Sequence, residues 1–391
     1  MRIDREYTRA TLARLVQINS VNPSLAAGAP GEGEIARWIA GSLGACGMES
    51  EIFEPERGRA TVLGRLAGTG GGRSLMLNAH CDTVDTAGMA EPFSGAVRDG
   101  RLYGRGAYDM KGSLAASMAA AKALVDAGVR LRGDLLVAAV ADEEYGSLGT
   151  RDLISRVKVD GAIVTEPTAL RVCLAHKGYV WIEVTSAGRA AHGSKFELGI
   201  DANMKMGAFL YELGKLERDL RARPPHPLVG PPSLHAALLS GGSGLSTYAA
   251  TSTVQIERRT IPGECEEQAV AEIQAMVDRL TAADADFHAT VRSFCARDPF
   301  EVAPNAGIVR AVDAAAERVL GRVPAHIGDT PWMDSALLQA AGVETVVFGP
   351  AGAGAHADVE WVDVESVMQL AEILAETAIA YCGVEGLAKA G

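Results

Sequence analysis

A histidine and an aspartate stand at the end of a short apolar run early in the chain. The run Leu75–Ala79 leads directly into His80, and Asp82 follows two residues later. The run is short enough for a buried strand, and ligand sites of α/β proteins lie where strands leave the sheet at their carboxyl ends. An imidazole at such a position is a common ligand of divalent metals, and a nearby carboxylate can hold its ring. The pair therefore predicts one corner of a metal site.

Four further candidate ligands lie on separate segments that also end apolar runs or glycine-rich stretches. The full set is His80, Asp109, Glu144, Glu166 and His356. Two imidazoles and three carboxylates suit zinc or a similar divalent metal. One catalytic zinc needs three protein ligands, whereas five suit a two-metal site in which one carboxylate bridges ions about 3.5–4 Å apart. Such a pair of ions activates water and polarises a carbonyl group.

Each candidate also has an ordinary structural interpretation. Asp109 can be the N-cap of the alanine-rich helix that follows it, and Glu144 can belong to a solvated acidic pair with Glu143. Glu166 precedes a proline and can simply form a turn, and His80 can cap a strand or pack in the core. The joint occurrence of all five residues at the ends of apolar segments favours the metal site.

The elements that would position these residues alternate between strands and helices. Apolar strands expected at 75–79, 134–140 and 161–164 end near His80, Glu144 and Glu166. Helices are expected over 6–18, 33–43, 113–127, 150–157, 306–320, 334–341 and 364–381, with further strands over 50–53, 61–66 and 344–348. Apolar strands separated by helices are typical of an α/β sheet, with the site along one edge.

The pattern changes between residues 178 and 293. The expected order there is strand, helix, strand, strand, helix, strand, which matches a ferredoxin-like α+β unit. A chain of 391 residues exceeds the usual size of one domain. We therefore expect a discontinuous first domain, 1–177 with 294–391, and an inserted domain, 178–293.

Composition excludes several classes of function. A net charge of −12 argues against a nucleic-acid surface, which needs concentrated basic residues. No apolar run reaches the length of a membrane-spanning helix, and the charged N-terminus shows no secretory signal. The six cysteines are scattered without a CxxC pair, as expected for reduced thiols in a cytoplasmic protein. Cys81, inside the suspected site, is expected only to pack.

Five stretches together resemble one known family. They are Asn78–Val84, Gly104–Gly112, Asp142–Glu144, Thr165–Thr168 and Phe348–Pro350 with Ala355-His356. In this order they are similar to the co-catalytic di-zinc amidohydrolases and peptidases, which include acetylornithine deacetylase, succinyl-diaminopimelate desuccinylase, aminoacylase and glutamate carboxypeptidase. The resemblance covers nearly the whole chain. It implies a zinc-peptidase-like catalytic domain with a central mixed sheet flanked by helices, and an inserted lid and dimerisation domain.

The resemblance also implies roles for the residues of the metal site. His80 and Glu166 would hold one Zn²⁺, Glu144 and His356 the other, and Asp109 would bridge them, with Co²⁺ or Mn²⁺ as possible substitutes. Asp82 would accept the second ring N–H of His80, and Glu143 would be the general base. A cis peptide bond after Asp109 is a further feature of the family.

Three residues outside the metal site match substrate contacts of the family. His192 would stabilise the oxyanion, in its own or the partner subunit's site, and Arg259 would grip a substrate carboxylate. Thr330 is a candidate contact in the substrate loop. One departure stands out, because the family's asparagine after Gly241-Gly242 is replaced by Ser246, which has a shorter reach.

The expected function is removal of an acyl group from an N-acyl amino acid by a cytoplasmic homodimer. The acyl group and the amino acid are left open. One alternative is a dipeptidase or a glutamate-carboxypeptidase-like metallopeptidase on the same site. An alternative of another class is a non-catalytic metabolite-binding protein, which the intact Glu143 and the complete ligand set disfavour.

Overall fold

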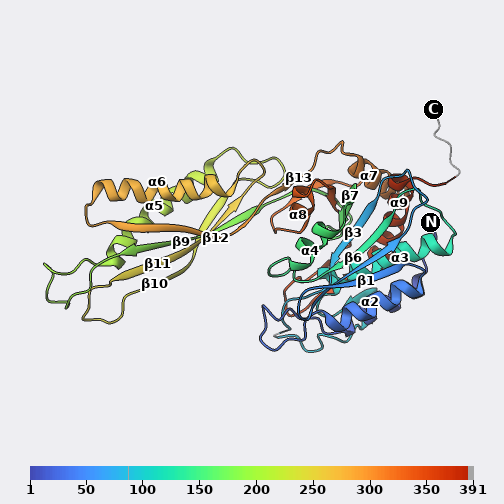
Figure 1. Ribbon diagram of the computed structural model, residues 1–391, viewed down its shortest axis with the longest axis horizontal. Coiled ribbons are helices and arrows are strands. Elements are labelled where there is room, and N and C mark those ends of the chain that lie inside the picture. The colour runs from blue at the N-terminus through green and yellow to red at the C-terminus, as the bar shows by residue number, and fades with distance from the viewer. Residues whose placement is uncertain (87, 386–391) are drawn as a thin grey trace. The chain divides into compact units, whose positions relative to one another are not determined.

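The computed structural model describes residues 1–86 and 88–385 (Figure 1). Contacts divide the chain into two compact units. The first comprises Met1–Leu174, Val302–Ile327 and Met333–Gly391, and the second comprises Ala175–Glu301 and Gly328–Trp332.

These bounds differ from the predicted ones at three places. The predicted boundary at 293/294 falls inside strand β12 (His288–Arg297), because this strand continues beyond the alternating segment from which it was predicted. The first boundary lies three residues earlier than predicted, and the short segment Gly328–Trp332 groups with the second unit. Thr330 therefore lies in the second unit, and Asp334 in the first.

The first unit is built on a mixed sheet with strand order β1-β2-β6-β3-β7-β15-β8, and β14 also pairs with β8. The four central strands β6, β3, β7 and β15 are parallel, and the flanking pairs are antiparallel. Every residue of β3, β6 and β7 is buried, as expected where both faces of a sheet are covered. The bounds are β1 Glu49–Glu56, β2 Arg59–Leu66, β3 Leu75–His80, β6 Leu135–Val140, β7 Gly161–Val164, β8 Val172–His176, β14 His326–Asp329 and β15 Glu344–Val347.

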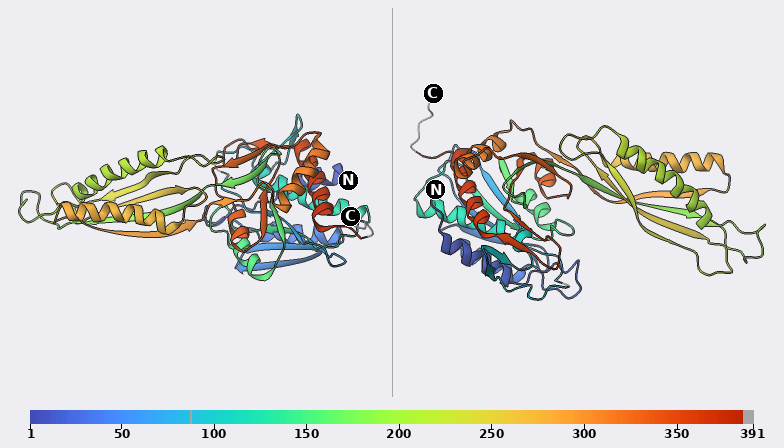
Figure 2. Two further views of the ribbon diagram at one scale, coloured as in Figure 1. Left: turned by 90° about the horizontal axis from the view of Figure 1, so that it is seen from above. Right: turned by 180° about the vertical axis from the view of Figure 1, so that it is seen from behind.

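Helices cover both faces of this sheet (Figures 1 and 2). A side chain at Gly64 of β2 would meet Leu43 of α2, whereas Thr61 faces Gly149 of α4. Positions 61 and 64 point to opposite faces of a strand, so α2 and α4 lie on opposite sides. α3 packs against α1 and α9, and α9 also packs against α7. α8 contacts α4. The bounds are α1 Arg5–Gln17, α2 Gly33–Ala45, α3 Gly112–Asp126, α4 Leu148–Arg156, α7 Gly307–Leu320, α8 Ser335–Ala340 and α9 Val364–Cys382.

A second, small antiparallel sheet lies in the first unit, with strand order β16-β17-β5-β4. β5 precedes the short π-helix η1, and β16 and β17 flank the segment that carries His356. The pairing of β17 with β5 thus brings together two segments that are about 260 residues apart in the chain. The bounds are β4 Val97–Arg98, β5 Arg101–Tyr103, η1 Ala107–Lys111, β16 Gly352–Ala353 and β17 Trp361–Asp363.

The second unit contains a four-stranded antiparallel sheet of order β10-β11-β9-β12, with helices α5 and α6 on one face (Figure 1). Alternate residues of β9 and β11 are buried, because only one face of the sheet meets the helices. Phe209 of α5, Ile273 of α6 and Ile182 of β9 belong to this core. The bounds are β9 Gly178–Ala187, α5 Ala202–Ala222, β10 Ser233–Gly241, β11 Thr251–Thr260, α6 Glu266–Ala283 and β12 His288–Arg297, with the short strand β13 at Phe300–Glu301.

The predicted fold class is confirmed, and the long helices lie within a few residues of their predicted positions. The order β9-α5-β10-β11-α6-β12 is the expected one for the second unit. β8 and the small sheet were not predicted, because their strands have five residues or fewer and no local pattern marks them. Within residues 1–86 and 88–385, no helix is long and apolar enough to cross a membrane.

Candidate metal centre

The five predicted ligands gather at one edge of the main sheet of the first unit. His80 is the last residue of β3, Glu144 follows β6 and Glu166 follows β7. Because these three strands are parallel neighbours, their carboxyl ends lie side by side. Asp109 lies in η1 and His356 lies between β16 and β17, so the small sheet brings both of them to this edge.

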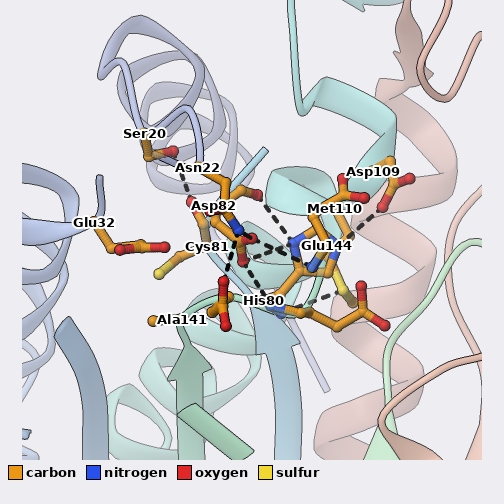
Figure 3. A network of polar contacts seen from close by, with 12 residues as sticks. Ser20, Asn22, Glu32, His80, Cys81, Asp82, Asp109, Met110, Ala141 and Glu144 are labelled. Atoms are coloured by element: carbon orange, nitrogen blue, oxygen red, sulfur yellow. Dashed lines mark hydrogen bonds and ion pairs between the residues drawn. The ribbon is translucent and has the colours of Figure 1, made fainter. Parts of the chain in front are cut away.

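The five side chains form two triads that share Asp109. In the first triad, His80 Nε2 lies 3.0 Å from Asp109 Oδ1 and 3.8 Å from Glu166 Oε1. In the second, His356 Nε2 lies 3.3 Å from Asp109 Oδ2 and 3.0 Å from Glu144 Oε2. Figure 3 shows the contact between His80 and Asp109. Each oxygen of Asp109 thus faces a different histidine, the arrangement that a bridging carboxylate needs.

The donor set fits divalent metal ions. Each triad offers one imidazole nitrogen and two carboxylate oxygens, with ligand atoms within 4.8 Å of one another. Nitrogen and oxygen donors in this proportion suit zinc, cobalt or manganese, and a catalytic zinc site has three such ligands and an open position. The residues present therefore fit one ion in each triad.

Electrostatics at this edge also favours bound cations. Burial opposes protonation of His80, but its hydrogen bond to Asp109 and the charges of Glu166 and Asp82 outweigh burial and raise its pKa well above the usual value. Hydrogen bonds to Asp109 and Glu144 raise the pKa of His356 to about 10. Burial, with the nearby charge of Asp109, raises the pKa of Glu166 well above its usual range. Several carboxylates thus lie close to two imidazoles, of which His80 is buried and His356 is exposed, and metal ions would take the place of the protons.

Glu360 holds the segment that carries Asp109. Its Oε1 accepts the backbone N–H groups of Tyr108 (2.9 Å) and Asp109 (3.0 Å), and its Oε2 accepts that of Gly106 (3.0 Å). Arg105 donates to Oε2 at 2.7 Å, and both side chains of this pair are buried. The Asp109–Met110 peptide bond is cis, as the resemblance implied. Glu360 was not predicted, because most of its partners are backbone groups, which no sequence pattern marks.

Asp82 has a different main partner from the one expected. His80 Nδ1 lies 3.0 Å from the backbone carbonyl of Asp82 and 3.6 Å from its carboxylate Oδ1. The carboxylate instead accepts the backbone N–H groups of Glu143 (3.1 Å) and Glu144 (3.3 Å). Asp82 therefore contacts both His80 and the loop that carries Glu143.

Glu143 lies beside the two triads. Burial, with the charges of Glu166 and Asp334, raises the pKa of Glu143 well above its usual range. A carboxyl group with a raised pKa can both take and return a proton near neutral pH. Asp334, a fully buried neighbour that bonds to Thr150 Oγ1 at 2.5 Å, was not singled out from the sequence. Cys81 is also buried, and burial raises the pKa of its thiol, consistent with packing.

The remaining predicted site residues belong to the second unit. His192 is exposed, its Nδ1 lies 2.8 Å from Ser194 Oγ, and its backbone pairs with Thr247. Arg259, on β11, donates to the backbone carbonyl of Thr330, and its guanidinium lies 5.6 Å from the Tyr179 ring centre. The structure therefore brings Arg259 and Thr330 together. Ser246 accepts the Gly193 N–H through its carbonyl at 2.7 Å, so it neighbours the His192 loop.

Comparison with known proteins agrees with this geometry. The chain is 28% identical over 380 residues to N-formyl-4-amino-5-aminomethyl-2-methylpyrimidine deformylase of Bacillus subtilis, covering 89% of each chain. It is 29% identical over 325 residues to acetylornithine deacetylase of Myxococcus xanthus, covering 81% of this chain and 82% of the relative. Its fold is similar to that of a tripeptidase from Staphylococcus aureus, with a TM-score of 0.78 at 20% identity, covering 96% and 98% of the two chains.

The model of peptidase family M20/M25/M40 matches residues 76–380, a span that contains all five candidate ligands and the whole second unit. The chain therefore belongs to peptidase family M20/M25/M40, a family of metal-dependent hydrolases that act on amide bonds.

Proposed function

We propose that this chain removes the acyl group from an N-acyl amino acid, as acetylornithine deacetylase and succinyl-diaminopimelate desuccinylase do. The observation that carries the proposal is the pair of triads that share Asp109, one oxygen toward each histidine. We propose two zinc ions there, one held by His80, Asp109 and Glu166 and the other by Asp109, Glu144 and His356, with Co²⁺ or Mn²⁺ able to replace them. When bound, the ions would polarise the amide carbonyl and lower the pKa of water toward neutrality.

The residues around the ions would move the proton. Glu143 would take a proton from the attacking water and give it to the leaving nitrogen, so that the C–N bond breaks into a carboxylate and a free amine. Its raised pKa supports this role, because a strongly acidic carboxylate would return the proton poorly. Asp82 would keep the base in place through its bonds to the Glu143 and Glu144 N–H groups.

The second unit would supply contacts to the substrate. We propose that His192 stabilises the oxyanion, in its own or the partner subunit's site, and that Arg259 binds the substrate carboxylate, with Thr330 beside it. The exposure of His192 and the contact between Arg259 and Thr330 support these roles. We propose that residues 178–293 act as a lid and dimerisation domain, supported by the exposed edge strand β10 with Leu238 and Leu239 at its surface. The six free thiols support a cytoplasmic location.

A second candidate is an amide whose amine part is not an amino acid. The deformylase relative, which acts on an N-formyl aminopyrimidine, covers 89% of this chain. In addition, Ser246 replaces the asparagine expected from the family, so we propose that the substrate contacts at this position differ from those expected from the resemblance. The dipeptidase or carboxypeptidase alternative rests on the family match alone.

A substrate panel tests the proposal. Purified protein loaded with zinc is assayed with N-acetyl and N-succinyl α-amino acids, a dipeptide and an N-formyl aminomethylpyrimidine, with release of the amine as the readout. We expect the highest kcat/KM on an N-acyl amino acid. A higher value on the dipeptide or on the pyrimidine would replace the proposal by the corresponding alternative. No hydrolysis of any amide by metal-loaded protein would refute it and favour a binding protein.

A further inference from the structure

Behind the metal edge, the side chain of Asn22 links two buried carboxylates. Its Nδ2 donates to Asp82 Oδ2 at 2.8 Å and to Asp142 Oδ1 at 3.0 Å, so both N–H groups of the amide are used (Figure 3). Its Oδ1 accepts the backbone N–H of Ser24 at 2.9 Å. Asn22, Asp82 and Asp142 are each at most 1% exposed, so water does not offer replacement partners.

Both carboxylates are connected to the loop that carries Glu143 and Glu144. Asp82 accepts the N–H groups of these two residues, and Asp142 directly precedes Glu143. Asp142 has a φ of 68°, a left-handed conformation that is unfavourable for residues other than glycine and must be held by its surroundings. The side chains of Asn22, Asp82 and Asp142 and the Glu143 N–H therefore form a closed ring.

The ring is anchored to the body of the first unit by Arg59. Its Nη2 donates to Asp142 Oδ1 at 2.6 Å, and its Nε and Nη2 both bond to the carboxylate of Glu32, which precedes α2. Arg59 is 4% exposed and Glu32 is fully buried. Arg59 lies at the start of β2, so the position of Asp142 is tied to a strand and to a helix at the same time. A bidentate guanidinium is a stiff connection between such elements.

Asn22 is also fixed independently of this ring. Its backbone N–H donates to the Thr83 carbonyl at 2.9 Å, and Val21 forms a parallel bridge with Thr83. Ser20 Oγ donates to the Cys81 carbonyl at 2.6 Å. The segment 20–22 therefore lies along the segment 81–83. These contacts hold Asn22 in place independently of its bonds to the two carboxylates.

We infer that Asn22 and Arg59 are positioning residues for the reaction. Asn22 bridges Asp82 and Asp142, Arg59 anchors Asp142, and together they fix the Glu143–Glu144 loop relative to His80. This inference rests on the proposed role of Glu143 as the base. A neutral amide suits the central position because it supplies two donors to two carboxylates without adding charge.

Two substitutions at Asn22 and one control test the inference. Asn22→Ala removes all side-chain bonds. Asn22→Asp keeps the shape and the acceptor for Ser24, but a carboxyl group offers at most one proton where the amide offers two. The matched control is Asn19→Ala, since Asn19 lies on the same segment and, among residues 1–86 and 88–385, its side chain accepts just the Val21 N–H, at 3.0 Å.

The first readout is hydrogen exchange of the Glu143 and Glu144 amides in metal-free protein, and the second is kcat and KM of zinc-loaded protein. We expect both Asn22 variants to exchange these amides at least about tenfold faster and to lower kcat at least about tenfold, with KM within about threefold of the wild type. Asn19→Ala should change neither. If the Glu143 and Glu144 amides of Asn22→Asp exchange at the wild-type rate, the bridging role is refuted, because a side chain of the same shape would then hold the loop without the two N–H donors.

Failure of the inference and failure of the proposed function give different results. If the wild type hydrolyses the amide and the Asn22 variants match Asn19→Ala in kcat, the positioning role is wrong and the function stands. If the wild type hydrolyses no amide, the function is wrong, and with it the role in the reaction, whatever the exchange rates show. Arg59→Lys provides a check that does not depend on Asn22, because a lysine keeps the charge but cannot bond to Glu32 and Asp142 with the same fork. Arg59→Lys should also increase the exchange rate of the Glu143 and Glu144 amides. A rate equal to that of the wild type would refute the role of Arg59 in anchoring Asp142.

Discussion

Substitution of Glu360 by glutamine should destabilise the first unit strongly, although the side chain keeps its size. Glu360 and Arg105 are 1% and 2% exposed, and removal of one partner from such a buried ion pair costs about 3–5 kcal/mol. Glu360 also accepts three backbone N–H groups with its two oxygens. A glutamine amide has one acceptor oxygen, so its NH₂ group would face N–H donors. We therefore expect a loss of at least about 3 kcal/mol in the free energy of unfolding.

Glu365→Gln is the matched control for this experiment. Glu365 pairs with Arg5 at the surface, where the two side chains are 57% and 61% exposed. Such a pair, together with its position in the first turn of α9, contributes at most about 1 kcal/mol. Urea denaturation of both variants without metal gives the comparison. If Glu360→Gln lies within about 1 kcal/mol of Glu365→Gln, Glu360 does not hold the Asp109 segment as described.

Three further predictions concern the metal centre and the substrate contacts. Because hydrogen bonds to Asp109 and Glu144 raise the pKa of His356 from 6.5 to about 10, its contribution to the stability of metal-free protein should be full below pH 6.5 and lost as the pH rises through about 10. Zinc binding must displace the proton on His356. Calorimetry of zinc binding in several buffers at neutral pH should therefore show that His356→Ala releases about one proton fewer than the wild type. Equal proton release would contradict the assignment of His356 as a ligand. Arg259→Lys should raise KM about 10- to 100-fold with little change in kcat. The control is Arg292→Lys on β12, which should leave both unchanged because the exposed Arg292 pairs with Glu183 of β9. His192→Ala should lower kcat about 10²- to 10³-fold while zinc content stays the same, with His226→Ala as the control, and an unaltered kcat would exclude a role at the oxyanion.

Much of the fold could be predicted from the sequence, because period and polarity are local properties. The largely apolar segments at β3, β6 and β7 indicated buried parallel strands, and the alternating segments at β9 and β11 indicated a sheet with one exposed face. The small sheet could not be predicted in the same way. Its strands have two or three residues each, and β5 pairs with β17 across the chain, so no local pattern marks them.

The candidate ligands could be predicted for a related reason. His80 ends β3, and Glu144 and Glu166 follow the ends of β6 and β7; such positions meet at one edge of a parallel sheet. The supporting residues could not be found in this way. Glu360 binds backbone N–H groups, and Asn22 acts through two carboxylates that lie 60 and 120 residues away in the sequence. Such contacts depend on the folded chain, and an isolated asparagine or glutamate in the sequence does not reveal them.

The central claim is that Glu143 acts as the base beside two metal ions. It is tested most directly by the hydrolysis rate of Glu143→Ala on the best substrate of the wild type, with the bound metal of the same samples determined by elemental analysis. The account predicts two zinc ions per chain, as in the wild type, and the loss of nearly all hydrolysis. Full activity in this variant would contradict the assignment of Glu143, and a single bound ion in both proteins would contradict the bridged site.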